Sequence, residues 1–155
     1  MVETGTARYA DLSCTGDGCS TLIFGYLAKM LNAILYSVDN NVQSRRGGRA
    51  IATKFLGYIE IVDSNSVEFL LGFDKGLIDF LYLDSQELDD DVLVSQTNYY
   101  NEIKAAYGKL SEKAVVMIDD CGIIKKGNCN LVKEFLIGEG WKILYMGYQG
   151  IFIRD

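Results

Sequence analysis

The sequence predicts a three-layer α/β fold, in which a doubly wound, mostly parallel sheet lies between helices and ends in an antiparallel hairpin. Short apolar runs typical of buried strands alternate with stretches of helical periodicity. Strands that form continuous apolar runs belong to parallel sheets covered by helices on both faces. The last two strand-like runs flank the stretch GYQG, and this spacing predicts a hairpin.

The first half of the chain predicts two helices and two strands after its N-terminal stretch. We expect a helix in STLIFGYLAKML with Ser20 as its N-cap. Its periodicity places the following apolar residues on one helical face: Leu22, Ile23, Tyr26, Leu27 and Met30. We expect strands in AILYSVD and YIEIVD, which end at Asp39 and Asp63. A further helix is predicted in SRRGGRAIATKFLG, although the adjacent glycines weaken its start.

The second half predicts three helices and four strands. We expect helices in SVEFLLGF, TNYYNEIKAAYGKL and NLVKEFLIGEG. Buried strands are expected in LIDFLYLD and AVVMIDD, which end at Asp84 and at the pair Asp119–Asp120. Aromatic residues alternate in the terminal hairpin and are expected to pack against the sheet: Trp141, Tyr145, Tyr148 and Phe152.

Composition limits the classes of function. A length of 155 residues predicts a single domain spanning 1–155. The net charge of −6 argues against a nucleic-acid partner, because phosphates bind basic surfaces. No apolar run reaches the roughly 18 residues of a membrane helix, and no signal peptide is recognised. We therefore expect a cytoplasmic protein without a membrane partner.

The reactive side chains are limited by the absence of histidine. Any general base must be a carboxylate, a lysine, a tyrosine or water. The cysteines form no CxxC pair, so a zinc site is not expected, and we predict reduced thiols. They are Cys14, Cys19, Cys121 and Cys129.

Acidic residues end four successive predicted strands: Asp39, Asp63, Asp84, Asp119 and Asp120. Ligands of parallel α/β sheets bind at the carboxyl ends of the strands. One acid at such a place is an ordinary loop residue. Four strands that end in this way indicate a role in ligand binding or catalysis.

The N-terminal stretch VETGTARYADLSCTGDGCST has two interpretations. In the favoured one, Glu3 and Gly5 end the first strand, while Gly18 and Ser20 begin a helix whose free N–H groups suit a carboxylate group. In the alternative, ARYADLSC is the first strand and Asp11 is its acid, but no glycine follows directly. The favoured interpretation leaves almost no strand before its acid, so we expect the domain to be truncated at its N-terminus.

The position of Asp39 suits a ribose. It lies 21 residues after Gly18, close to the roughly 20-residue offset at which an acid accepts hydrogen bonds from ribose hydroxyls in dinucleotide-binding folds. The same spacing fits NAD, so an NAD-binding enzyme stays an alternative. The loop lacks the complete GxGxxG pattern that favours NAD.

These motifs together resemble the class I S-adenosylmethionine (SAM)-dependent methyltransferases, whose fold is Rossmann-like. ETGT and DGCST are similar to the two ends of the family's first motif, and YSVDN resembles its acidic second motif. LIDFLYLDS and AVVMIDD resemble the motifs on the fourth and fifth strands, and GWKILYMGYQGIFIRD resembles the closing hairpin. The DD at the end of the fifth strand is similar to that of small-molecule O-methyltransferases.

The resemblance implies methyl transfer from SAM to a small-molecule acceptor, with oxygen as the accepting atom. It implies these cofactor-binding residues: Glu3, Gly5, Thr6, Gly18, Ser20, Thr21, Asp39, Asn40, Asp63, Ser64 and Asp84. Asp84 and Asp119 are the implied catalytic residues. With Asp120 they are also the implied ligands of Mg²⁺, a hard cation that prefers oxygen ligands. A SAM- or nucleotide-binding domain without transferase activity stays the alternative. Because no substrate lid is evident after the fifth strand, we expect either a homo-oligomer or the missing N-terminal residues to complete the acceptor site.

Overall fold

The computed structural model describes residues 1–9, 14, 19–86, 92–122, 127 and 129–154. Gly18 and Asp11 lie outside the described residues. The chain divides into two compact units, Met1–Ser66 and Val67–Asp155, which we describe separately. The prediction of a single domain stays a prediction. No helix of the described chain is long and apolar enough to cross a membrane.

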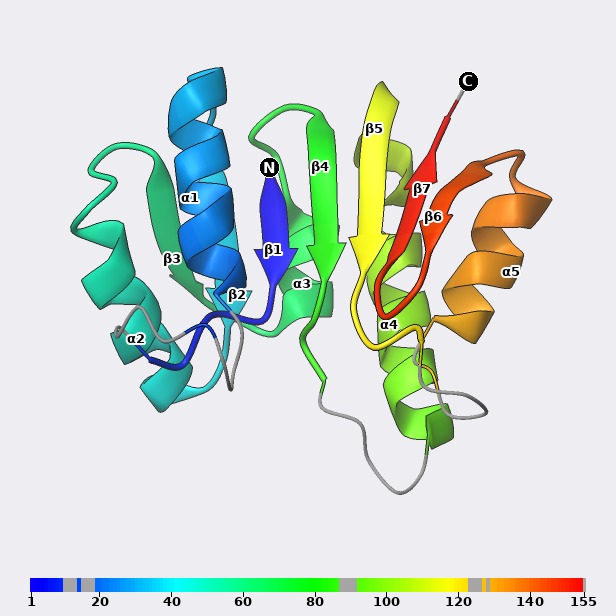
Figure 1. The fold of residues 1–155 in the computed structure, drawn as a ribbon, viewed down its shortest axis with the longest axis horizontal. Helices are drawn as coiled ribbons and strands as arrows, with labels where there is room; N and C mark the ends of the chain where they lie inside the picture. Colours follow the sequence, from blue (N-terminus) through cyan, green and yellow to red (C-terminus); the bar gives the residue numbers. More distant parts are fainter. Residues whose placement is uncertain (10–13, 15–18, 87–91, 123–126, 128, 155) are drawn as a thin grey trace. The chain divides into compact units, whose positions relative to one another are not determined.

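The first unit is a β-α-β-α-β arrangement with parallel strands in the order β3-β2-β1 (Figure 1). Its elements are β1 (Val2–Thr4), α1 (Ser20–Leu31), β2 (Leu35–Asp39), α2 (Val42–Ala52) and β3 (Ile59–Asp63). Glu3 pairs with Ser37, and Asp39 pairs with Asp63 across the neighbouring strands. The first strand is therefore the one that contains Glu3, as the favoured interpretation of the N-terminal stretch predicts.

Helix α1 buries a different face from the predicted one. Its buried residues are Thr21, Phe24, Gly25 and Ala28, whereas Tyr26 is 60% exposed and Met30 is 82% exposed. Small residues decide this, because a Cβ at Gly25 would lie 2.6 Å from Cδ1 of Ile59. Gly25 lets the helix approach β3 closely. Tyr26 and Met30 point outward, whereas Phe24 is buried and Leu22 of the predicted face packs against the core. The N-cap is Cys19 rather than Ser20.

Helix α2 begins at Val42 and ends at Ala52, although the sequence placed it at residues 44–57. Asn41 is its N-cap and accepts hydrogen bonds from the N–H groups of Gln43 and Ser44. Gly47 and Gly48 lie buried within the helix instead of weakening its start. A Cβ at Gly47 would lie 2.3 Å from the carbonyl oxygen of Arg8. The glycines therefore let the segment after β1 lie directly on the helix.

The second unit contains strands in the order β4-β5-β7-β6 (Figure 1). Its elements are α3 (Ser66–Gly72), β4 (Ile78–Leu83), α4 (Val92–Ala106), a 3-10 turn (Tyr107–Lys109), β5 (Leu110–Ile118), α5 (Asn130–Gly138), β6 (Lys142–Met146) and β7 (Gly150–Ile153). β4 and β5 are parallel, and the β6–β7 hairpin joins β5 antiparallel. The predicted mostly parallel sheet with an antiparallel C-terminal pair is confirmed.

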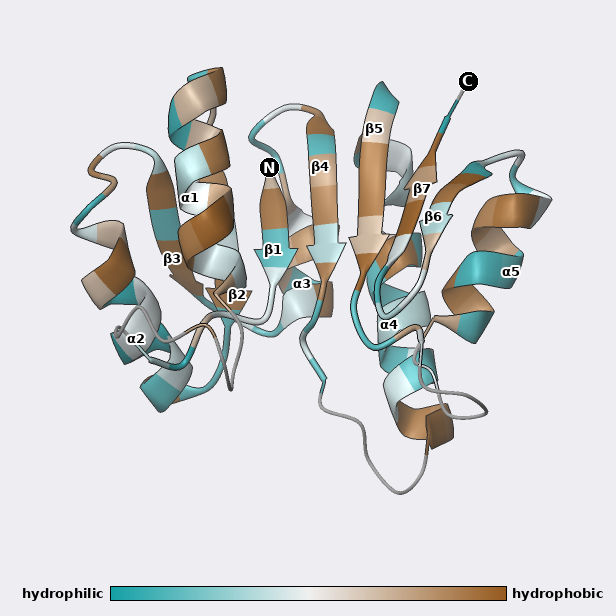
Figure 2. Cartoon of the chain, viewed as in Figure 1, coloured by the Kyte–Doolittle hydropathy of each residue, from teal (hydrophilic) through white to brown (hydrophobic). Residues whose placement is uncertain are grey.

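The buried core of the second unit includes residues of its strands β5 and β7. Figure 2 shows hydrophobic residues over most of β5 and β7, and Val116, Ile118 and Phe152 have no exposed surface. The prediction that all four hairpin aromatics pack against the sheet is only half right. Trp141 and Phe152 are buried, but Tyr145 and Tyr148 are more than half exposed. Tyr148 lies in the turn between β6 and β7, where no sheet face covers it.

Candidate functional site

The candidate cofactor site of the first unit is built on the carboxyl ends of its parallel strands. The amide N–H of Thr6, just after β1, donates to Oδ2 of Asp39 at the end of β2, at 3.0 Å. The N–H of Asn41 donates to Oδ1 of the same carboxylate at 2.7 Å. Two backbone groups thus hold Asp39 in one orientation. Each carboxylate oxygen retains a lone pair, so the group can still accept hydrogen bonds from ligand hydroxyls.

Gly5 turns the chain out of β1. Its φ is 88°, a value that glycine adopts without steric cost. Its N–H donates to the carbonyl oxygen of Val38 at 2.9 Å, which keeps the turn beside β2. The glycine after the acid is therefore needed for the backbone conformation that brings Thr6 to Asp39.

Glu3 lies at the centre of a buried network of hydroxyl groups. Its Oε2 accepts hydrogen bonds from Oγ1 of Thr21 at 2.9 Å and from Oγ of Ser37 at 2.7 Å. Because Ser37 donates to Glu3, the hydroxyl of Thr6 is the donor in its 2.8 Å contact with Ser37. Thr21 also accepts from the N–H of Ala7 at 2.9 Å. The network ties β1, β2 and the first turn of α1 together.

Burial raises the pKa of Glu3 to about 7, although hydrogen bonds from Ser20, Ser37 and Thr21 lower it. Neither Glu3 nor Thr21 has exposed surface, so these two side chains position their neighbours. Their predicted contacts with a cofactor stay predictions. Ser37 was missed by the sequence analysis, although a polar residue in an apolar strand was an available signal.

Arg45, which the sequence analysis also missed, connects the ends of β2 and β3. Its guanidinium forms an ion pair with Asp63 at 2.9 Å and donates to the carbonyl oxygen of Asp39 at 3.3 Å. Asp63 therefore has a protein partner, while most of its side chain stays exposed. Ser64 donates to the carbonyl oxygen of Asn65 at 3.0 Å, and Asn40 is exposed beside Asp39.

The chemistry of these groups fits SAM. Asp39 can accept from the ribose hydroxyls, and Cys19 caps α1 without any side-chain hydrogen bond. The first N–H groups of this helix therefore have no side-chain acceptor at the cap, and such groups suit a carboxylate like that of methionine.

In the second unit, the acids that end β4 and β5 are neighbours. The N–H of Asp119 donates to the carbonyl oxygen of Leu83 at 3.0 Å, which carries the parallel ladder to the strand ends. Asp84 follows Leu83 directly and lies near the buried Tyr99, whose pKa is raised by burial and by the charge of Asp84. The positional rule thus brings Asp84 and Asp119 to the same edge, as expected.

Burial raises the pKa of Asp119, and hydrogen bonds with Gln149 and Tyr82 lower it only in part. The amide of Gln149 also donates to the hydroxyl of Tyr82 at 3.2 Å. No local pattern predicts a role for Gln149, because its place beside Asp119 depends on how the hairpin folds back onto β5. The result is a carboxylate more basic than an ordinary aspartate.

Asp120 has a different environment. Its φ is 54°, which is uncommon for a residue other than glycine. The hydroxyl of Tyr148 donates to it, and this hydrogen bond, with burial and the charge of Asp120, raises the pKa of Tyr148 to about 12. Asp120 thus has Tyr148 of the hairpin turn as its partner, whereas Asp119 has Gln149 of the same turn and Tyr82 of β4.

The predicted Mg²⁺ site is not formed by the described residues. Asp84, Asp119 and Asp120 do not converge as a ligand set, and the described part of the chain holds no group of three or more Cys, Asp or Glu side chains that could hold a metal ion. Asp119 and Asp120 accept hydrogen bonds from different side chains, Asp119 from Gln149 and Tyr82 and Asp120 from Tyr148.

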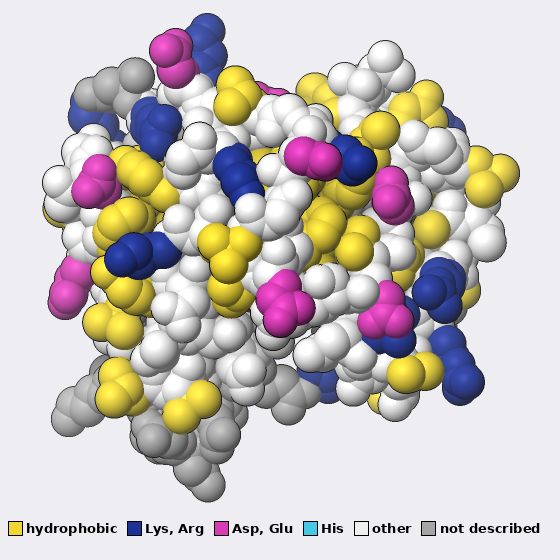
Figure 3. Space-filling model, turned by 180° about the vertical axis from the view of Figure 1, so that it is seen from behind, with side chains coloured by type: hydrophobic (Ala, Val, Ile, Leu, Met, Phe, Trp, Pro, Cys, Tyr) yellow, Lys and Arg dark blue, Asp and Glu magenta, His cyan; other side chains and the backbone are white. Residues whose placement is uncertain are grey.

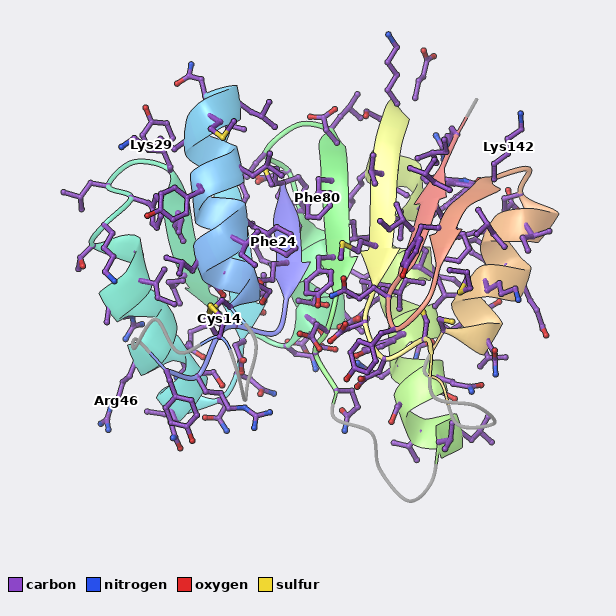
Figure 4. The ribbon with its side chains drawn as sticks, in the orientation of Figure 1. Cys14, Phe24, Lys29, Arg46, Phe80 and Lys142 are labelled. Atoms are coloured by element: carbon purple, nitrogen blue, oxygen red, sulfur yellow. A yellow bond between two sulfur atoms is a disulfide. The ribbon has the colours of Figure 1, made fainter. Side chains whose placement is uncertain are left out.

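The prediction of reduced thiols is wrong for one pair of cysteines. Cys14 and Cys19 form a disulfide, and Figure 4 places Cys14 beside the end of α1 where that helix begins. Cys121 and Cys129 are free thiols. The prediction rested on the absence of a CxxC pair, but these two cysteines bond across a sequence separation of 5.

Comparisons with known proteins agree with this fold. A protein family described as "Methyltransferase domain" matches residues 15–121. The chain belongs to this methyltransferase family. With it come the class I fold and SAM as the methyl donor, in agreement with the resemblance seen in the motifs. No match was found among the curated proteins.

Solved methyltransferase structures share the fold across nearly the whole chain. A proposed caffeoyl-CoA O-methyltransferase from Staphylococcus aureus is 12% identical, with a TM-score of 0.67 over 99% of this chain and 75% of its own. A proposed rRNA methylase from Clostridium thermocellum is 11% identical, with a TM-score of 0.68 over 99% and 87%. A proposed methyltransferase from Streptococcus mutans, solved with S-adenosylhomocysteine (SAH), is 10% identical, with a TM-score of 0.64 over 99% and 87%.

Proposed function

We propose that this methyltransferase transfers the methyl group of SAM to an oxygen atom of a small molecule. The observation that carries the proposal is Asp119, a half-buried carboxylate with a raised pKa at a strand end. A hydroxyl acceptor must lose its proton as its oxygen is methylated, and the chain has no histidine to take it. A carboxylate of raised pKa is a better proton acceptor than an ordinary aspartate.

The proposed mechanism divides the tasks between residues. SAM supplies a methyl group on a positively charged sulfur. Asp39 accepts hydrogen bonds from the ribose hydroxyls, and the N–H groups at the start of α1 bind the methionine carboxylate. Asp119 takes the acceptor's proton at its carboxylate, while Gln149 and Tyr82 keep that carboxylate oriented. Asp84 contributes negative charge at the same edge.

The net charge supports a small-molecule acceptor over RNA, which is the main alternative because an rRNA methylase shares the fold. A charge of −6 repels phosphates. Figure 3 shows basic side chains scattered among acidic and apolar ones on the face that it draws. A cytoplasmic location and a homo-oligomer remain part of the proposal. Cell fractionation and sedimentation test these two points.

The decisive experiment incubates the protein with isotope-labelled SAM and a panel of phenols, catechols, carboxylic acids, amines and an rRNA transcript. We expect the labelled methyl group in a phenol or catechol product. A reagent that cleaves aryl methyl ethers should then release the label, which shows that the methyl group is on oxygen. Label in an amine or in the rRNA would contradict the proposed acceptor class. Calorimetry with SAH and NAD runs beside it, and we expect binding of SAH alone.

A further inference from the structure

The two free cysteines of the second unit lie together in the segment that follows β5. Cys121 comes directly after Asp120, and Cys129 is the N-cap residue of α5. Their side chains are in hydrogen-bond contact, although seven residues separate them in the sequence. The proposed methyl transfer uses neither of them.

Glycines explain how the chain returns to its starting point. A Cβ at Gly127 would lie 2.5 Å from the carbonyl oxygen of Cys121, so only glycine allows this close approach. The side-chain amide of Gln96 in α4 donates to the carbonyl oxygen of Gly127 at 2.8 Å and anchors that end. The chain is thus already beside Cys121 two residues before it reaches Cys129.

Cys121 is held from the hairpin side as well. Its N–H donates to the carbonyl oxygen of Tyr148 at 2.6 Å, and the N–H of Gly122 donates to the same oxygen at 3.2 Å. A Cβ at Gly150 would lie 3.0 Å from Sγ of Cys121, so the sulfur lies against β7. Both thiols are therefore placed by backbone contacts, which do not depend on their own interaction.

The two thiols differ in acidity. The hydrogen bond with Cys129 raises the pKa of Cys121, and burial adds to this effect. The same hydrogen bond, helped by the charge of Lys133, lowers the pKa of Cys129. A thiolate in contact with a thiol is the arrangement from which disulfides form by exchange.

We propose that Cys121 and Cys129 are a modification site at which thiol–disulfide exchange forms a second disulfide, beside Asp119 and Asp120. The reaction partner is a low-molecular-weight disulfide such as oxidised glutathione. Two S–H bonds of the protein break and one S–S bond forms, while the partner's S–S bond is reduced to two thiols that take up the two protons and two electrons. The bond joins Cys121, which follows the acid pair, to Cys129 at the start of α5.

The reaction needs an oxidant, which is the low-molecular-weight disulfide, and Cys14 and Cys19 of the first unit already form such a bond with each other. The new bond constrains Cys121, whose N–H holds the backbone of Tyr148, and the hydroxyl of Tyr148 meets Asp120. Oxidation therefore acts on the acids at the strand end through the hairpin turn.

The test uses the double variant Cys14→Ser/Cys19→Ser, in which only the second pair remains. The protein is equilibrated in glutathione buffers from fully reduced to fully oxidised, then alkylated and weighed intact. We expect both thiols to disappear together, with the loss of two hydrogen atoms and no glutathione adduct, and the melting temperature to rise. Cys121→Ser and Cys129→Ser in the same background are the controls and should show neither change.

Stable glutathione adducts on the double variant, disulfide-linked dimers, or independent alkylation of the two thiols in the oxidised buffer would overturn the proposal. If the double variant does not fold, peptide mapping of the oxidised wild-type chain decides between the Cys121–Cys129 bond and its absence. None of these measurements depends on methyl transfer, so their outcome is separate from that of the proposed function.

Discussion

The strand ends of the two units hold their acids through different groups. In the first unit, Asp39 at the end of β2 accepts hydrogen bonds from the backbone N–H groups of Thr6 and Asn41. In the second unit, Asp119 and Asp120 after β5 receive side-chain hydrogen bonds from Gln149 and Tyr148 of the hairpin turn. The comparison teaches that the positional rule for strand-end acids locates a site, whereas the partners decide the protonation and the role of each acid.

The largest expected effect comes from removing Asp119, the proposed general base of the second unit. Asp119→Asn should lower kcat by about 10²–10⁴-fold, the contribution of a general base. In the wild type, activity should rise with pH through a pKa above that of an ordinary aspartate, because burial raises the pKa of this group. Asp79→Asn, at an exposed acid of β4, is the matched control. Equal activity of the two variants would remove Asp119 as the base.

The same assay tests the metal prediction that the geometry did not support. Because Tyr82, Gln149 and Tyr148 bind the acids, a chelator should leave kcat unchanged. Activity that is lost in chelator and restored by Mg²⁺ would mean that the acids rearrange around the ion.

The next effect concerns the buried acid of the first unit. The pKa of Glu3 is raised from 4.5 to about 7, so the folded state prefers its protonated form. Its contribution to stability is fully present below pH 4.5 and is lost as the pH rises toward 7. The loss is about 3 kcal/mol at 1.36 kcal/mol per pKa unit.

Urea unfolding of the wild type and of Glu3→Gln across this pH range measures that loss. The Gln variant keeps an acceptor for Thr21 and Ser37 but does not titrate, so the difference between the two free energies of unfolding should follow the pKa. An identical pH dependence of both proteins would show that Glu3 does not titrate in this range.

A smaller effect sharpens the role of Asp39. Asp39→Ala should weaken SAH binding by about 2 kcal/mol, roughly 30-fold in Kd, because hydrogen bonds to a charged group are lost. Glu60→Ala is the control, since this exposed acid of β3 is not among the predicted cofactor-binding residues, and we expect the affinity for SAH to stay unchanged. Calorimetry with SAH that gives equal affinities for the two variants would place the ribose elsewhere.

The smallest expected effect tests the contact between α2 and the segment after β1. A Cβ at Gly47 would meet the backbone of Arg8, so Gly47→Ala should destabilise the protein by about 1–2 kcal/mol despite the better helix propensity of alanine. A Cβ at Gly72 in α3 would meet nothing within 4 Å, so Gly72→Ala is the control. Thermal melts that show Gly47→Ala as stable as the control would contradict the close packing.

Much of the site could be predicted because it depends on local rules. Gly5 was recognised because a glycine closely follows the acid Glu3, and Asp39 because it ends an apolar run at a suitable spacing from Gly18. Ser37 and Arg45 escaped, since their roles depend on which residues lie opposite them across β1 and β3. Gln149 escaped for the same reason, because antiparallel pairing of β7 with β5 brings the turn to Asp119.

The sequence by itself determined the alternation of strands and helices, the closing hairpin, and the acids at the strand ends, because periodicity and turn residues act over a few neighbours. Only the tertiary structure decided which face of α1 is buried, where close approach at Gly25 outweighs the larger apolar residues. It alone decided that Asp119 and Asp120 bind tyrosine and glutamine side chains instead of forming a metal-ligand set. Such choices depend on distances between residues far apart in the chain, which no local pattern contains.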